Sequence, residues 1–250
     1  SQEIRQSMKS LYTGILAIRS AAFFAAYAFI TLFFSISGIV FTWFLPFRLR
    51  GRYFVIGNTL IILCLRLFCG VRTEVIGTLP KASDGPYVAL AKHQSQWETF
   101  YLQWFLFPVA TVVKKELLSI PFFGWALRMM NAIGIDRSNP RTAMRQTMEK
   151  GTQRLRDGYN LLIFPEGTRV NHGERGKYAR GGAGIAVKAG APILPIAHNA
   201  GRVWPAKSLI IHPGVVTLHI GALINTHDRD PKQLSEEVGE WIEARCSEMP

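Results

Sequence analysis

A histidine and a glutamate five positions apart, His93 and Glu98, form the first pair of residues in this chain that could do chemistry. Histidine can accept a proton near neutral pH, and a carboxylate partner fixes the imidazole tautomer and stabilises the imidazolium that forms. Such a pair can activate a hydroxyl group carried by a substrate, because the base removes the proton as the oxygen attacks. The sequence has no Gly-x-Ser-x-Gly elbow and no cysteine beside a histidine, which agrees with chemistry that needs no protein nucleophile.

Glu98 also fits a structural role at the start of a helix. The apolar run at residues 87–91 has the pattern of a short buried strand, and a helix can begin at Ser95 and extend to about Phe107. Ser95 and Glu98 match the capping-box pattern Ser-x-x-Glu, in which each side chain bonds a backbone N–H group at the helix start. The sequence therefore leaves two interpretations of Glu98 open, a helix cap and an orienting partner for His93.

The stretch Phe-Pro-Glu-Gly-Thr-Arg at residues 164–169 could bind an anion. It turns out of a buried-strand pattern at residues 160–164, and the missing side chain of Gly167 would let an anionic group approach the backbone. The guanidinium of Arg169 can bind a phosphate through two parallel hydrogen bonds. Arg137 ends a separate strand pattern and could converge on the same phosphate, because ligand sites in α/β proteins lie at the carboxyl ends of strands. Either arginine taken singly also fits a solvated surface charge.

The composition limits the classes of partner. The chain has 250 residues, a formal net charge of +12 and a pI of about 10.0, which favours phosphate-bearing substrates, acidic carrier proteins or anionic lipids. The basic residues are scattered and match no recognition motif, so we expect no nucleic-acid partner.

We also expect no metal and no other cofactor. His198, His212, His219 and His227 lack metal-ligand spacing, the glycine-rich stretches match no nucleotide-binding motif, and the three cysteines have no zinc or disulfide-framework spacing.

The amino-terminal region, residues 1–70, has the composition of a membrane-binding helical segment. Residues 21–46 contain no charged side chain, a shorter apolar run follows at residues 53–65, and three arginines separate the two runs. A single transmembrane anchor is one interpretation, whereas a cleavable signal peptide fits poorly because the first run is too long. Since both flanks of that run are basic, we prefer a re-entrant two-helix motif that bends near residues 35–38 and keeps all basic residues in one headgroup layer.

Residues 71–250 have the pattern of one α/β domain. Buried-strand patterns at residues 87–91, 109–113, 133–137, 160–164, 191–197 and 215–220 alternate with helical patterns at residues 95–107, 142–156, 181–188 and 231–247. Such alternation predicts a mixed, largely parallel sheet flanked by helices on both faces.

Four motifs in chain order resemble those of the glycerolipid acyltransferase superfamily and, within it, the bacterial lysophosphatidate acyltransferases. They are the histidine and acid at residues 93–98, Gly-Ile-Asp-Arg at residues 134–137, the stretch at residues 164–169, and Ala-Pro-Ile-Leu-Pro at residues 191–195. The Phe-Pro-Glu-Gly-Thr-Arg stretch is highly specific, whereas the proline motif is weak alone. The commonest form of the first motif has aspartate where this chain has Glu98, whose side chain is longer by a methylene.

The resemblance implies a role for each matched residue. The implied catalytic pair is His93, as general base, and Glu98. The residues implied to bind the substrate are, for the phosphate, Arg137, Arg169, Lys114 and Lys115 and, for the rest of the pocket, Glu166, Gly167, Thr168 and Pro192. The implied reaction moves an acyl chain from acyl-CoA or acyl-carrier protein to the free hydroxyl of lysophosphatidate, giving phosphatidate without a covalent acyl-enzyme. The implied location is the lipid bilayer of the bacterial inner membrane, at its cytoplasmic face.

Two other functions remain as alternatives. A sister acyltransferase would use lyso-ornithine lipid or glycerol 3-phosphate as its acceptor, and rates on these compounds and on lysophosphatidate distinguish the enzymes. A non-enzymatic protein that binds anionic membranes would keep all its activity after His93→Ala, whereas the enzyme would lose turnover and keep membrane binding.

Overall fold

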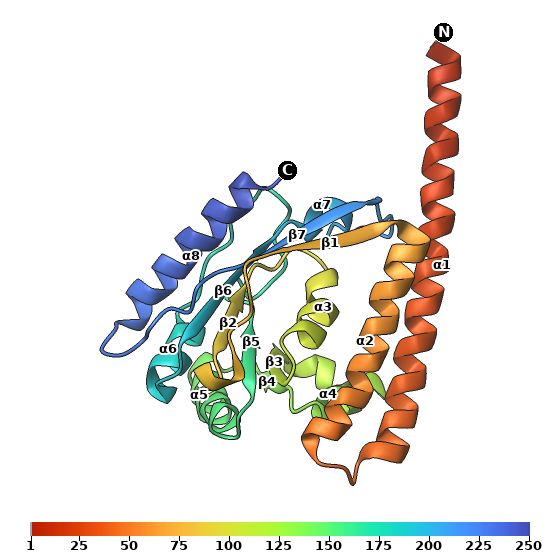
Figure 1. The fold of residues 1–250 in the computed structure, drawn as a ribbon. Helices are drawn as coiled ribbons and strands as arrows, with labels where there is room; N and C mark the ends of the chain where they lie inside the picture. The colour runs from red at the N-terminus through yellow and green to blue at the C-terminus, as the bar shows by residue number, and fades with distance from the viewer. Residues whose placement is uncertain (1) are drawn as a thin grey trace.

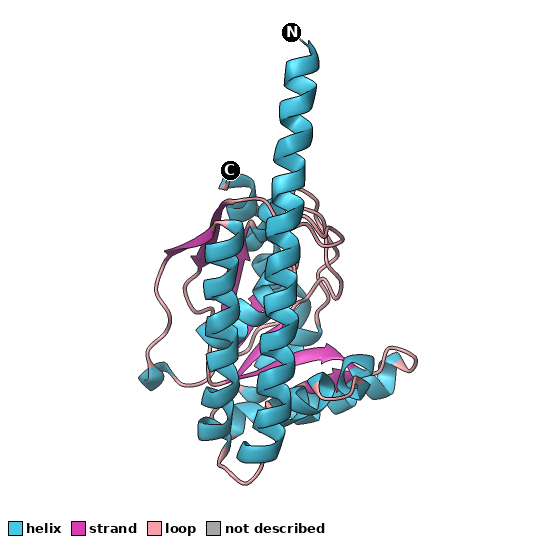
Figure 2. Ribbon diagram, turned by 90° about the vertical axis from the view of Figure 1, so that its right-hand side faces the viewer, coloured by secondary structure: helices cyan, strands magenta, loops and turns pink. Residues whose placement is uncertain are grey.

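The computed structural model describes residues 2–250, which begin with two long helices that lie side by side (Figure 1 and Figure 2). Helix α1 spans Gln2–Thr42, and α2 runs back over Phe47–Cys69. Gly70, in the left-handed conformation with φ of 68°, ends α2 and returns its N–H to the last turn of the helix. Both helices are long and apolar enough to cross a membrane, judged by length and composition.

The expected bend near residues 35–38 is wrong, because α1 continues unbroken through this stretch. Gly38 serves close packing instead: a side chain at this position would meet the ring of Phe54 on α2 at 2.5 Å. The chain reverses only after Thr42, so the three arginines early in α2 lie at the end of the helix pair opposite to Arg5. The basic residues of this region therefore do not share one layer.

Large apolar side chains lie on the outer surface of the helix pair. Those exposed on α1 and α2 include Phe29, Leu32, Phe33, Phe41, Ile56, Leu60, Leu63 and Leu67. Exposed apolar area of this extent is unfavourable in water, and it marks surfaces that contact lipid or another protein. The surface of the two helices therefore fits membrane association.

Within residues 2–250, seven strands form one sheet in the order β1-β7-β6-β2-β5-β3-β4. The strands are β1 Val71–Ile76, β2 Val88–Ala91, β3 Val109–Lys114, β4 Ile133–Ile135, β5 Asn160–Ile163, β6 Ile193–His198 and β7 Gly214–Ile220. Neighbouring strands run parallel except β6 and β7, which are antiparallel. The predicted mixed, largely parallel sheet is confirmed.

Helices cover both faces of the sheet (Figure 1). On one face lie α5 Pro140–Arg156, α6 Gly181–Ala189 and α8 Pro231–Glu248. On the other face lie α3 Trp97–Phe105, α4 Phe123–Met129, the short α7 Ala200–Val203 and the amino-terminal helix pair. Two short 3₁₀ helices, η1 Ala82–Asp84 and η2 Lys115–Ser119, occur in the connections.

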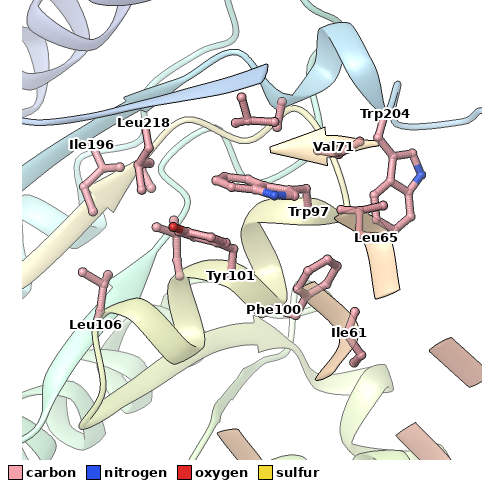
Figure 3. Close-up of a cluster of buried hydrophobic side chains, with 14 of the residues drawn as sticks. Ile61, Leu65, Val71, Trp97, Phe100, Tyr101, Leu106, Ile196, Trp204 and Leu218 are labelled. Carbon is pink, nitrogen blue, oxygen red and sulfur yellow. The ribbon is translucent and has the colours of Figure 1, made fainter. Parts of the chain in front are cut away.

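Alternate residues of the central strands are buried on opposite faces. In β2, Val88 and Leu90 join the apolar cluster beneath α5, α6 and α8, whereas Ala89 and Ala91 join the cluster around Trp97. A strand covered on both faces is apolar at every position, so these strands appear in the sequence as continuous apolar runs. Figure 3 shows Trp97 at the centre of its cluster, beside Tyr101. This packing fixes the start of α3 and therefore the segment that leads into it.

Candidate active site

Two adjacent parallel strands bring the two predicted motifs together. β2 pairs with β5 with Leu90 opposite Ile163, so both strands leave the sheet at the same edge. His93 follows the end of β2, and the turn at residues 164–169 follows the end of β5. Ligand sites in parallel α/β sheets form where the carboxyl ends of strands meet. The sequence motifs therefore share one edge of the sheet.

His93 and Glu98 form a direct pair. Nδ1 of His93 lies 2.9 Å from Oε1 of Glu98, whose side chain is fully buried. The same oxygen accepts hydrogen bonds from the backbone N–H of Gln94 at 2.7 Å and of Ser95 at 2.8 Å. The two interpretations of Glu98 are thus compatible, because one oxygen both closes the loop before α3 and orients the imidazole. Since a carboxylate oxygen only accepts, Nδ1 carries the proton and Nε2 is left as the basic nitrogen.

Glu98 stays ionised in spite of its burial. Burial by itself raises the pKa of the carboxyl, but the imidazoles of His198 and His93 and the backbone N–H of Ser95 outweigh burial and hold the pKa below its ordinary value. The ionised form is the one that stabilises an imidazolium, so the pair suits a histidine that accepts a proton.

Three further contacts fix His93. Its ring stacks on Phe164, with the ring centroids 4.2 Å apart and 17° between the planes. The backbone N–H of His93 donates to Oε1 of Glu166 at 3.0 Å, and the backbone carbonyl of His93 accepts from the N–H of Val170 at 2.8 Å. Because these partners lie in or beside the turn at residues 164–169, that turn and the histidine form one unit.

A second histidine, His198, lies behind Glu98 and was not among the predicted site residues. Its side chain is fully buried, with Nε2 3.8 Å from Oε2 of Glu98 and 2.8 Å from the carbonyl of Lys92. The N–H of Ala200 donates to Nδ1 at 3.1 Å, so Nε2 carries the proton. Burial lowers the pKa of His198, which favours the neutral ring. Among the described residues, Oε2 of Glu98 accepts no hydrogen bond, since the Nε2–H of His198 donates to the carbonyl of Lys92 instead.

His93 lines a cavity of about 860 Å³ that has two unlike ends. One end is cationic and is lined by Lys114, Arg137 and Arg169. The other end runs between α1, α2 and α4, where its apolar lining includes Ile30, Phe34, Phe54, Ile61, Leu127 and Met130. A cavity with these two ends fits a molecule that has an anionic head and a hydrocarbon tail.

The predicted phosphate-binding residues divide between this cavity and the outer surface. Lys114 and both predicted arginines line the cavity, and the guanidinium of Arg137 donates to the carbonyl of Gly167. Lys115 instead forms a surface ion pair with Asp136 at 3.1 Å, and its side chain is 62% exposed. The structure therefore brings three of the four cations to the site.

The predicted pocket residues divide in the same way. Gly167 and Thr168 line the cavity. The side chain of Glu166 is fully buried beneath the turn, where Oε2 accepts a hydrogen bond from Nζ of Lys92 at 3.0 Å. Pro192 precedes β6, which runs parallel to β2, so it lies at the end of the strands opposite the cavity. Glu166 is thus placed to support the turn, and Pro192 lies apart from the site.

The amino-terminal helices are part of the cavity wall. The hydroxyl of Tyr27 on α1 accepts a hydrogen bond from the side-chain amide of Gln96 at 3.0 Å, and both residues line the cavity. Asn58 on α2 donates to the carbonyl of Phe100 on α3 at 3.0 Å. The sequence does not indicate Tyr27 as a site residue, because nothing in a long apolar run shows which side chain faces a site.

Comparison with known proteins agrees with this geometry. Residues 72–199 match a family model described as Acyltransferase. A 1-acyl-sn-glycerol-3-phosphate acyltransferase of Pseudomonas aeruginosa is 42% identical over 94% of this chain and 93% of its own length. One of Cocos nucifera is 30% identical over 60% of this chain and 50% of its own length. The crystal structure of the 1-acyl-sn-glycerophosphate acyltransferase of Thermotoga maritima has the same fold, with a TM-score of 0.75 and 23% identity over 96% of both chains. The chain belongs to the acyltransferase family.

Proposed function

We propose that this protein transfers an acyl chain from a thioester to the free hydroxyl of 1-acyl-glycerol 3-phosphate, giving phosphatidate. The observation that carries the proposal is the cavity, whose lining combines a histidine base with a cationic end and an apolar end. Lysophosphatidate has the matching parts, a phosphate, a hydroxyl and one acyl chain. The relative from Pseudomonas aeruginosa, similar over nearly the whole chain, is named for this activity.

In the proposed mechanism His93 is the general base. Nε2 takes the proton of the acceptor hydroxyl while the oxygen attacks the thioester carbonyl, and Glu98 stabilises the imidazolium that forms. The tetrahedral intermediate collapses with cleavage of the carbon–sulfur bond, and the departing thiolate takes the proton back from the imidazolium. No bond to the protein forms at any step, so each turnover returns the histidine to its starting state.

Lys114, Arg137 and Arg169 are proposed to hold the acceptor phosphate. All three side chains are exposed at the cationic end of the cavity, and charge-assisted hydrogen bonds to phosphate are among the stronger polar contacts in proteins. Lys115, which pairs with Asp136 at the surface, is proposed to meet an anionic acyl carrier, either acyl-CoA or acyl-carrier protein.

The helix pair is proposed to attach the enzyme to the cytoplasmic face of the bacterial inner membrane. Its exposed apolar side chains would contact the acyl region of the bilayer. Because α1 and α2 also form the apolar wall of the cavity, an acceptor could pass from the membrane into the site without exposing its acyl chain to water.

An acyl-transfer assay with purified protein in vesicles tests the proposed function. Lysophosphatidate, lyso-ornithine lipid and glycerol 3-phosphate are offered as acceptors, each with acyl-CoA and with acyl-carrier protein as donors. We expect phosphatidate to form from lysophosphatidate at the highest kcat/KM. A higher kcat/KM on either of the other acceptors would contradict the proposed substrate, and the better donor identifies the carrier.

A further inference from the structure

A buried lysine, Lys92, connects the carboxy-terminal helix α8 to the proposed active site. Lys92, the residue before His93, is fully buried, and its Nζ lies 3.0 Å from Oε2 of Glu166 and 2.7 Å from Oε1 of Glu243. The carbonyl of Glu174 accepts a third hydrogen bond at 3.0 Å. All three donors of the ammonium group are therefore used.

Tyr178 completes the connection to α8. Its hydroxyl donates to Oε1 of Glu243 at 2.6 Å. Its ring lies over Gly239, one turn earlier on the same face of α8, where a Cβ would come within 3.1 Å of the ring. Burial raises the pKa of Tyr178, and the hydrogen bond to Glu243 raises it further, so the hydroxyl stays protonated and donates. α8 is thus shaped to receive this tyrosine and to hold Glu243 in one orientation.

Glu166 connects Lys92 to the backbone of His93, the proposed base. Its Oε2 accepts from Lys92 and from the N–H of Gly176 at 3.1 Å, while its Oε1 accepts from the N–H of His93 at 3.0 Å. A Cβ at Gly176 would lie 2.5 Å from Oε2, so this close approach needs glycine. Each carboxylate oxygen of Glu166 is occupied, and a shift of Lys92 would displace the carboxylate that binds the histidine backbone.

Lys92, Glu166 and Glu243 form a largely buried charged cluster, and a stable core does not require such a cluster. Burial alone lowers the pKa of Lys92, but Glu243 and Glu166 outweigh burial and hold the pKa above its ordinary value. Taking such charges out of water is expensive, and well-packed apolar residues often stabilise a fold at least as well. Glu243 also lies beyond residues 72–199, the part matched by the family model. The position of the cluster beneath His93 suggests a role in orientation.

We propose that Glu243 is a positioning residue for acyl transfer. By sharing Lys92 with Glu166, it fixes the orientation of Glu166 and therefore the backbone of His93 relative to the anion-binding turn. Tyr178 holds Glu243 in place. This inference rests on the proposed function, because it assigns Glu243 to the site in which His93 is the base.

The substitution Glu243→Gln tests the inference, because it keeps the size of the side chain and an acceptor for Tyr178 but removes the charge. We expect kcat to fall about tenfold or more, a loss typical for residues that orient a functional group through hydrogen bonds. Glu237→Gln is the matched control, since it removes a carboxylate from the same helix that pairs with Arg229 at the surface, and it should leave kcat unchanged.

A second substitution keeps the test informative if Glu243→Gln folds poorly. Tyr178→Phe removes only the hydroxyl that holds Glu243, and we expect a smaller fall in kcat, about threefold to tenfold. Tyr159→Phe, at a tyrosine that packs against Phe47 away from the cavity, is its control.

The pH profile separates a positioning role from a simple loss of folded protein. Without Glu243, the charge on Lys92 makes the potential at the imidazole more positive, so the acid limb of kcat/KM should move to lower pH. A smaller folded fraction lowers the whole profile without moving this limb. The other ionisable groups that face Lys92 and Glu243 are unchanged by the substitution, and they are Glu166, His172, Arg175, Tyr178, His198 and Cys246.

The outcomes distinguish this inference from the proposed function. Normal kcat and an unmoved acid limb in Glu243→Gln, together with an inactive His93→Ala, would overturn the positioning role and leave the proposed function standing. Full activity in His93→Ala would overturn both. A reduced kcat with the limb at lower pH, and a normal Glu237→Gln, supports the positioning role.

Discussion

The base side of the cavity and its cationic side are built in different ways. Glu98 is fully buried, its Oε1 contacts three donors, and His93 is fixed through its ring, its N–H and its carbonyl. Arg137 and Arg169 are exposed, as is Lys114, and they lie in loops or at a strand end. A base must be oriented before the substrate arrives, whereas cations can remain solvated until a phosphate replaces their water. The difference predicts that the two sides control different kinetic constants.

The largest effect should follow from removal of the base. His93→Ala should lower kcat by about 10²–10⁴-fold, the usual contribution of general acid–base catalysis, and leave the acceptor KM nearly unchanged. Steady-state kinetics on lipid vesicles measures both constants. His227→Ala, at a histidine whose side chain is 84% exposed, is the control and should behave as the unmodified protein. A His93→Ala variant with normal kcat would remove the base from the mechanism.

The next effect concerns the partner of the base. Glu98→Gln keeps an oxygen that can accept from the backbone N–H of Gln94 and Ser95, but it loses the charge that stabilises the imidazolium. We expect kcat to fall about a hundredfold while the thermal unfolding temperature changes little, since the cap survives. If kcat is normal and only the unfolding temperature falls, Glu98 is a helix cap alone.

On the cationic side, Arg169→Ala should act on acceptor binding. A charge-assisted hydrogen bond contributes about 1.5–3 kcal/mol, so the acceptor KM should rise about tenfold to a hundredfold while kcat changes little. Kinetics with varied lysophosphatidate at saturating donor measures the split. A fall in kcat at constant KM would mean that this arginine belongs with the base and that the two sides are not separate.

The smallest effect distinguishes two adjacent lysines. Lys114→Ala should raise the acceptor KM, because its side chain lines the cavity, whereas Lys115→Ala should change the acceptor KM by less than about twofold. Lys115 pairs with Asp136 at the surface, and exposed pairs of this kind contribute little. An equal rise of KM in the two variants would place both cations at the phosphate.

The sequence predicted the central strands and one edge strand of the sheet, β4, but not the other edge strand, β1. β2, β5 and β6 are covered on both faces and therefore appear as apolar runs. β1 was missed because it alternates with Arg72 and Glu74 and is placed only by pairing with β7, far along the chain. The prediction of a bend in α1 was wrong for a related reason. Gly38 packs against Phe54 on α2, and residue spacing within one helix cannot show such a contact.

The candidate site was predicted where the chemistry is local in the sequence. His93 and Glu98 lie one loop apart, so their pairing could be inferred from spacing. The contacts of Lys92 with Glu243 and of Glu98 with His198 join segments that only the fold brings together. Pro192 shows the opposite limit, because a motif can match by residue type and still lie at the other end of its strand.

The separate roles of His93 as base and of Arg169 in phosphate binding can be tested in one comparison of two acceptors, lysophosphatidate and a monoacylglycerol that lacks the phosphate. We measure kcat/KM for both in the unmodified protein, in Arg169→Ala and in His93→Ala. The account predicts that Arg169→Ala loses most of the preference for the phosphate-bearing acceptor and that His93→Ala loses activity on both acceptors in equal proportion. An unchanged preference in Arg169→Ala, or continued transfer in His93→Ala, would contradict it.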